Sequence, residues 1–244
     1  MKLSNQIKAT MALAGLALAV GSAHAAVVID FDSYSVGDIN LQGPWVDFGG
    51  SLTSDVSTTV AFSGTQSLEL KSDAAGYGSD VYIVDLNGAP VTSGQWNLSF
   101  QTYLPTGFDS HLALYQSQGA MPADFFVGAF PVLQGDNGVI VIEASSTPLV
   151  FGAWAKVEML IDLDADTLAI SYDGTPFHSG AWDTDATGTP SIGGLDWWAA
   201  GPNPSSGVSA YIDDLSLTQV PEPATMGLLS LGALLALKRR RRAS

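Results

Sequence analysis

The sequence predicts an all-β fold, a sandwich of two antiparallel sheets placed between two terminal signals. Three observations predict it. Short apolar runs alternate with polar residues at a period of two, the pattern of a half-buried strand. Gly, Asn, Asp and Pro separate these runs, as turns require. No segment between the termini carries an apolar stripe at helical spacing with capping residues.

The strands expected in the first half all end at turn residues. Asn87-Gly88 is a strong hairpin signal, and Pro105 stops the run that precedes it. We expect these strands at Val27–Phe31, Ser67–Lys71, Val81–Leu86 and Trp96–Leu104.

The second half contains the clearest hairpin, over Lys156–Asp173. Val157, Met159 and Ile161 share one face, and the chain returns after an Asp-rich turn. Further strands are expected at Val139–Ile142 and Ser209–Thr218.

Residues 1–25 have the features of an export signal helix. Two lysines precede the apolar run Met11–Val20, and Ala23 and Ala25 form a small-x-small cleavage pattern. We expect signal peptidase to cleave after Ala25. The alternative is an uncleaved anchor, which the short apolar run disfavours.

Residues 221–244 have the order of a sorting tail. An apolar run at 224–237 would span about 21 Å as a helix, short of a hydrocarbon core of about 30 Å. The arginines favour the cytoplasmic side and would hold the segment in the membrane until a protease acts. The alternative is a core helix of the folded domain. The motif residues are Val220, Pro221, Glu222 and Pro223, followed after the run by Arg239, Arg240, Arg241 and Arg242.

This tail closely resembles the PEP-CTERM sorting signal of Gram-negative bacteria. The resemblance implies cleavage by an exosortase-type membrane protease. It also implies export through the inner membrane with a transient C-terminal anchor, and a cell-surface or extracellular destination, often in bacteria that make exopolysaccharide. It says nothing of the activity of the sorted domain.

The remaining residues, 26–220, fit one domain and are strongly acidic. They keep two lysines, no arginine and 23 acidic residues, a formal net charge of 2 − 23 = −21. This balance argues against nucleic acid and polyuronates as partners, because both need cationic contacts. It favours neutral glycans, cation-bridged polymers or simple solubility. The sequence has no cysteine, which excludes disulfides, thiol catalysis and thiolate metal sites.

Three segments resemble concanavalin A-like jelly-roll domains of the lectin/glucanase and laminin-G type. This resemblance implies a jelly roll whose first and last strands lie side by side, and domains of this build often carry structural calcium there. The segments are Ile29–Asp38, Ile161–Thr167 followed by Tyr172–Gly174, and Tyr211–Leu215.

Four aspartates are the expected calcium ligands: Asp30 and Asp32 on one face of the first strand, with Asp213 and Asp214 in the last. If these strands pair, hard oxygen ligands converge, as Ca²⁺ requires. The alternative is that the aspartates accept backbone N–H groups at strand ends. Asp162, Asp164 and Asp166 resemble the opening of an EF-hand loop, but their flanks are strands, so we expect a polar hairpin turn.

Sugar contact is expected from the tryptophans in loop-like surroundings, Trp182, Trp197 and Trp198. Aromatic rings stack on the apolar faces of sugars. The alternative is that these rings cap an open end of the sandwich.

No motif in the sequence predicts catalysis. The Glu-x-Asp-x-x-Glu run of jelly-roll glucanases and a Gly-x-Ser-x-Gly motif are both missing from the sequence. We therefore expect a non-enzymatic surface or matrix protein that contacts extracellular polysaccharide. The alternatives are a glycan-degrading enzyme, which needs two placed carboxylates, and a purely structural or adhesive protein.

Overall fold

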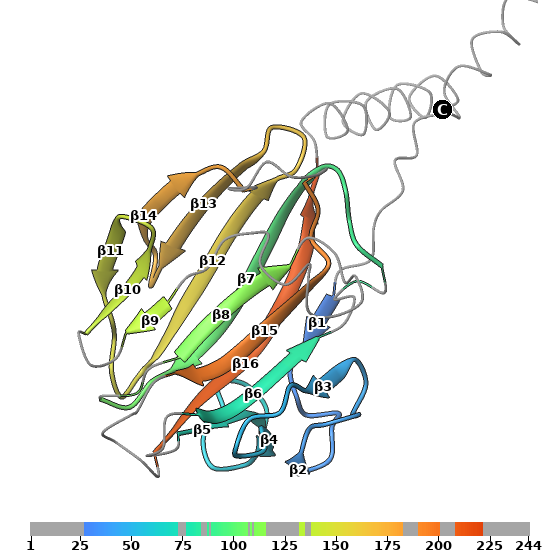
Figure 1. Cartoon of the computed structure of the whole chain (residues 1–244), viewed down its shortest axis with the longest axis vertical. Helices are drawn as coiled ribbons and strands as arrows, with labels where there is room; N and C mark the ends of the chain where they lie inside the picture. The colour runs from blue at the N-terminus through green and yellow to red at the C-terminus, as the bar shows by residue number, and fades with distance from the viewer. Residues whose placement is uncertain are drawn as a thin grey trace, which may run out of the picture.

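The structure, a computed structural model, describes residues 27–72, 77–83, 87, 89–106, 108, 110–115, 132–134, 138–182, 190–200 and 208–221. Two antiparallel sheets lie face to face (Figure 1), which confirms the predicted sandwich. The predicted signal helix and tail helix lie outside the described residues. Within the described ranges, no helix has the length and apolar character needed to cross a membrane.

The larger sheet has nine strands, and the last strand of the domain lies inside it. This strand, β16, pairs with β7 on one side and with β5 and β1 on the other. Val27 of β1 is opposite Leu217 of β16, which confirms that the first and last strands are neighbours. In spatial order the strands are β14 (Thr175–Gly180), β13 (Thr167–Tyr172), β12 (Trp154–Asp162), β7 (Gln95–Tyr103), β16 (Ser209–Val220), β5 (Ser67–Lys71), β4 (Asp55–Ser57) and β2 (Gly37–Asp38), with β1 (Val27–Ile29) beside β16.

The smaller sheet has seven strands, of which the sequence predicted β6 and β10 and missed the other five, β15 among them. Its order is β11 (Ser145–Pro148), β10 (Val139–Ile142), β9 (Val132–Gln134), β8 (Ser110–Tyr115), β15 (Gly194–Ala200), β6 (Tyr77–Ile83) and β3 (Trp45–Asp47).

The core lies between the sheets and follows the alternation of the strands. In β12, Val157, Met159 and Ile161 are buried, while Leu160 points outward and is 46% exposed. Their partners across β7 are also buried, as the register of this pair requires. The Lys156–Asp173 hairpin is therefore confirmed, with β12 and β13 in the predicted antiparallel register.

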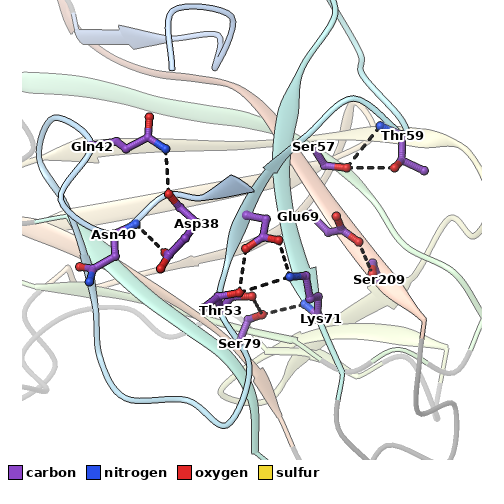
Figure 2. Close-up of polar contacts among 11 residues, drawn as sticks. Asp38, Asn40, Gln42, Thr53, Ser57, Thr59, Glu69, Lys71, Ser79 and Ser209 are labelled. Carbon is purple, nitrogen blue, oxygen red and sulfur yellow. Dashed lines mark hydrogen bonds and ion pairs between the residues drawn. The ribbon is translucent and has the colours of Figure 1, made fainter. Parts of the chain in front are cut away.

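Polar contacts also connect the two sheets directly. On one side, the Ser79 hydroxyl of β6 accepts the Lys71 N–H of β5 at 2.9 Å and donates to the Thr53 carbonyl at 2.9 Å (Figure 2). On the other, His178 Nδ1 of β14 lies 3.2 Å from Ser145 Oγ of β11. The Lys71–Ser79 and His178–Ser145 contacts each join strands of different sheets, so hydrogen bonds as well as the core hold the two layers together.

Replacing Trp197 by alanine is expected to lower the free energy of unfolding by about 3–5 kcal/mol, because it leaves a large cavity between the sheets. Trp197 is 1% exposed and contacts Trp45 and Phe100. Urea denaturation of residues 26–220 measures this. Leu160→Ala, on the outer face of β12, is the control and should change stability by less than about 0.5 kcal/mol. Equal effects of the two changes would contradict the core assignment.

Candidate functional site

Asp30 and Asp32, two of the predicted calcium ligands, do not lie on a strand face. Strand β1 ends at Ile29, and both aspartates are exposed in the turn that follows. Phe31 between them has a φ of 62°, which an extended strand does not allow. Asp30 Oδ1 accepts the Asp32 N–H at 3.2 Å. The predicted placement on one strand face is therefore wrong, because a local turn ends the strand early.

Three of the four predicted ligands, Asp32, Asp213 and Asp214, anchor one loop, Phe62–Gln66. Asp213 is fully buried, and its Oδ2 accepts the N–H groups of Phe62 and Ser63 at 2.8 and 3.1 Å. Asp32 Oδ1 accepts the Thr65 and Gln66 N–H groups at 2.8 and 3.0 Å. Asp214 Oδ1 accepts the Ser63 hydroxyl at 2.6 Å. Burial raises the pKa of Asp213, although its backbone donors act in the opposite direction.

These contacts fit the alternative role, in which the aspartates accept backbone amides. A carboxylate oxygen aimed at N–H donors is not arranged for a cation, which needs six to eight oxygen ligands turned toward it. Across the described ranges, no group of three or more acidic or histidine side chains is placed to hold a metal ion. Calcium stays a prediction from the sequence, and melting curves of the domain with calcium and with chelator test it.

Replacing Gly64, in the Phe62–Gln66 loop, is expected to lower the stability of the protein strongly. Gly64 has a φ of 58°, and a Cβ there would lie 1.7 Å from Asp32 Oδ2. Gly152 has a φ of 65° with open space around it, so it shares the backbone strain without the clash. Gly64→Ala should therefore lower the melting temperature more than Gly152→Ala, which carries only the strain of about 1–3 kcal/mol. Similar losses in thermal melts would mean that Asp32 does not anchor this loop.

Two of the three predicted sugar-contact tryptophans lie in the core. Trp182 is 0% and Trp197 is 1% exposed, so neither presents a ring face to solvent, and the predicted contact is wrong for both. The Trp182 Nε1–H donates to the Ser191 carbonyl at 3.0 Å. Glycines and prolines near these residues suggested loops, but Trp197 belongs to β15 and its side chain fills the space between the sheets.

The third predicted sugar-contact tryptophan, Trp198, lies on the outer face of the seven-stranded sheet. Strand alternation turns Trp198 and Asp196 away from the core side of β15, where Trp197 lies. In the register of β15 with β6, Trp198 is opposite Asp80 and Asp196 is opposite Tyr82. Tyr82 and Trp198 are both half-buried. We call these four residues, Asp80, Tyr82, Asp196 and Trp198, the acid-pair face.

Asp80 and Asp196 are diagonal neighbours across β6 and β15, and their carboxyl groups are close enough for the Asp196 side chain to influence the pKa of Asp80. Asp196 is only 4% exposed, and Asp80 Oδ1 is buried without a hydrogen-bond partner. Burial raises the pKa of Asp80 to about 6; the hydrogen bond with Asp196 opposes this rise and the nearby charge of Asp47 adds to it. A shared proton is the expected state of such a pair at mildly acidic pH.

Phe48 extends the acid-pair face with a further exposed ring. It is 37% exposed and meets Tyr82 edge-on, with ring centroids 5.7 Å apart. Sequence reasoning missed this site because Asp80 and Asp196 are far apart in the sequence and each is a single acid in an apolar run. The available signal was an acid at an outward position of a strand that is otherwise apolar.

A pH series tests the acid pair. Between pH 3.8 and about 6, the folded protein holds a proton on Asp80 that the unfolded chain has released. The contribution of this proton to stability is therefore fully present below pH 3.8 and is lost as the pH rises through about 6. Asp80→Asn keeps the size and a hydrogen-bonding group of Asp80 but cannot become charged. It should melt at a higher temperature than wild type at pH 7.5, with the difference shrinking toward pH 5. The exposed-acid control Asp164→Asn should show no such pH-dependent difference; a constant difference for Asp80→Asn would contradict the shared proton.

The outer face of the nine-stranded sheet carries a second set of rings, which we call the aromatic row. Trp154, Tyr103 and Tyr211 are opposite one another on β12, β7 and β16. Phe62, from the anchored loop, meets Trp154 edge-on at 5.8 Å and is 47% exposed. All the contacts along the row are edge-to-face, so the rings do not form one flat platform.

The acidic turn at residues 162–166 is a hairpin, as predicted. Asp162 Oδ1 accepts the N–H groups of Asp164 and Ala165 at 3.1 and 2.9 Å. These hydrogen bonds, with the Ala165 amide first, lower the pKa of Asp162. The Asp162 carboxylate therefore stabilises the hairpin turn by accepting its backbone N–H groups.

Comparison with known proteins bears on the tail and on the fold. Residues 219–242 match the family model of the PEP-CTERM protein-sorting motif. No curated protein matches this sequence.

Solved structures of similar fold include lectin II from Ulex europaeus, with a TM-score of 0.54 and 12% identity over 81% of this chain and 99% of the lectin. The carbohydrate recognition domain of Emp46p, in a potassium-bound form, gives 0.54 and 10% identity over 80% of this chain and 98% of that domain. A sialidase gives 0.56 and 12% identity over 81% of this chain, which spans only 19% of the sialidase. These identities establish the fold alone. The protein therefore carries a PEP-CTERM sorting motif directly behind a lectin-like jelly-roll sandwich.

Proposed function

We propose that this protein is an exported, non-enzymatic surface or matrix protein that binds a neutral polysaccharide through the acid-pair face. The observation that supports this most is the pairing of Asp80 with Asp196 beside Tyr82 and Trp198 on the outer face of a lectin-like sheet. Carboxyl groups beside aromatic rings accept hydrogen bonds from sugar hydroxyls, and the rings cover the C–H faces of the sugar.

The charges of the domain favour a neutral glycan. Both of its lysines are engaged by carboxylates of the same sheet. Lys71 contacts Asp55, and Lys156 Nζ lies 2.6 Å from Glu158 Oε1. A polyuronate would therefore meet a domain of net charge −21 without an uncommitted cation to receive its carboxylates.

The geometry of the acid pair favours binding over hydrolysis. Glycosidases separate their two carboxyl groups by about 5–5.5 Å or about 6.5–9.5 Å, so that a sugar or a water fits between them. Asp80 and Asp196 instead lie close enough for one to influence the pKa of the other. A pKa of about 6 nevertheless suits acid–base chemistry, which keeps a glycan-degrading enzyme as the second candidate.

The sorting motif supports the cellular part of the proposal. Export through the inner membrane is followed by processing by signal peptidase at Ala25 and by an exosortase-type protease at the tail. The domain is thereby delivered to the cell surface or to the extracellular polysaccharide.

The test is a screen of residues 26–220 against neutral and acidic glycans, followed by affinity measurements on variants. Trp198→Ala and Tyr82→Ala should each weaken binding at least about tenfold, the effect of losing an aromatic hot spot. Trp154→Ala, an equally half-buried ring on the opposite sheet, is the control and should bind as wild type does. Melting curves confirm that each variant is folded.

Three results would overturn the proposal in different ways. Loss of binding in Trp154→Ala alone would move the site to the aromatic row. Release of shortened oligosaccharides that Asp80→Asn abolishes would establish the enzyme. No binding to any glycan would leave a structural or adhesive surface protein.

A further inference from the structure

The acid-pair face groups acidic and aromatic side chains in a two-by-two pattern. Asp80 of β6 is opposite Trp198 of β15, and Tyr82 of β6 is opposite Asp196 of β15. Each acid therefore has an aromatic residue as its neighbour both across the strands and along its own strand. Phe48, which is 37% exposed, adds a third ring beside Tyr82. Negative charge and aromatic rings thus lie within one small area of the sheet.

Asp80 is the acid of this face that a ligand meets first. It is half-buried, whereas Asp196 is only 4% exposed and contributes its negative potential from deeper in the face. Burial raises the pKa of Asp80 to about 6, and the nearby charge of Asp47 adds to this rise. Above that pH the Asp80 carboxylate stands in a negative environment, which a positive group would relieve.

No lysine or arginine of the domain belongs to the sheet that carries the acid-pair face. Residues 26–220 contain two lysines, Lys71 and Lys156, and these belong to β5 and β12 of the nine-stranded sheet. Each is engaged there by a carboxylate. In the strand register His111 of β8 is two strands away from Asp80. The positive group that suits this face is therefore one that a ligand supplies.

We propose that the acid-pair face selects, within an otherwise neutral polysaccharide, a hexosamine residue that carries a free, protonated amine. An ammonium group forms an ion pair with the Asp80 carboxylate, and the faces of Tyr82 and Trp198 attract the same positive charge. An N-acetylated residue has no charge, so it keeps only the stacking and hydrogen bonds of a neutral sugar. This inference rests on the proposed glycan binding and adds the chemical group that the site recognises.

Two hexamers of β-1,4-linked N-acetylglucosamine test this selection, one fully acetylated and one with a single free amine. Residues 26–220 are titrated calorimetrically at pH 6.5, above the pKa of Asp80, in about 0.15 M salt, which screens distant charges. The hexamer with the amine should bind at least about tenfold more tightly than the acetylated hexamer. Equal affinities, tighter binding of the acetylated hexamer, or no binding of either would overturn the inference.

The variants Asp80→Asn and Asp164→Asn separate recognition at the face from attraction by the net charge of the domain, because each removes one negative charge. Asp80→Asn should reduce the ratio of the two affinities to about threefold, the share left to the rings. Asp164→Asn, at an exposed turn, should leave the ratio as in wild type. An equal reduction in both variants would contradict the inference. Melting curves confirm that both variants are folded.

Failure of this inference is distinguishable from failure of the proposed function. If neutral glycans bind in a manner that depends on Tyr82 and Trp198, and the free amine makes no difference, the proposed function stands and the inference is wrong. If no glycan binds, with or without an amine, the proposed function is wrong and the inference falls with it.

Discussion

The position of Trp197 between the two sheets is the constraint on which the rest of the structure depends. Its ring stacks on Trp45 of the same sheet with centroids 6.1 Å apart and meets Phe100 of the other sheet edge-on at 5.2 Å. A strand alternates its side chains, so burying Trp197 forces Asp196 and Trp198 onto the outer face. The core contact thereby fixes the residues that face Asp80 and Tyr82, and the proposed binding face is supported by packing rather than by a loop.

The acidic residues of this domain are used in two different ways. Asp32 and Asp213 accept backbone amides and hold the Phe62–Gln66 loop on the nine-stranded sheet. Asp80 interacts with Asp196 instead of with the backbone, and burial raises the pKa of Asp80. The first arrangement satisfies donors that folding would otherwise leave unpaired, and it stabilises the fold. The second is costly when both groups are charged, which is typical of a site kept for binding or chemistry.

Local pattern predicted the strands that alternate clearly, which are β1, β5, β6, β7, β10, β12, β13 and β16, and it missed the other eight strands of the structure. The alternation of apolar and polar residues identifies a strand around Leu68 and Leu70, and another over Val157 to Ile161. The number of such alternating segments predicts the sandwich. β15 escaped prediction because Gly193-Gly194 and Trp197-Trp198 do not alternate polar with apolar residues. The acid pair escaped because no local pattern brings Asp80 beside Asp196. The calcium prediction was built on a first strand reaching Asp32, but the positive φ of Phe31 ends that strand.

The most direct test of the account is chemical-shift mapping of isotopically labelled domain, residues 26–220, titrated with a neutral oligosaccharide. We expect saturable shifts at Asp80, Tyr82, Asp196 and the Trp198 indole, with little change at Trp154 and Phe62 on the opposite sheet. Shifts confined to those two rings, or no saturable shift with any neutral sugar, would contradict it.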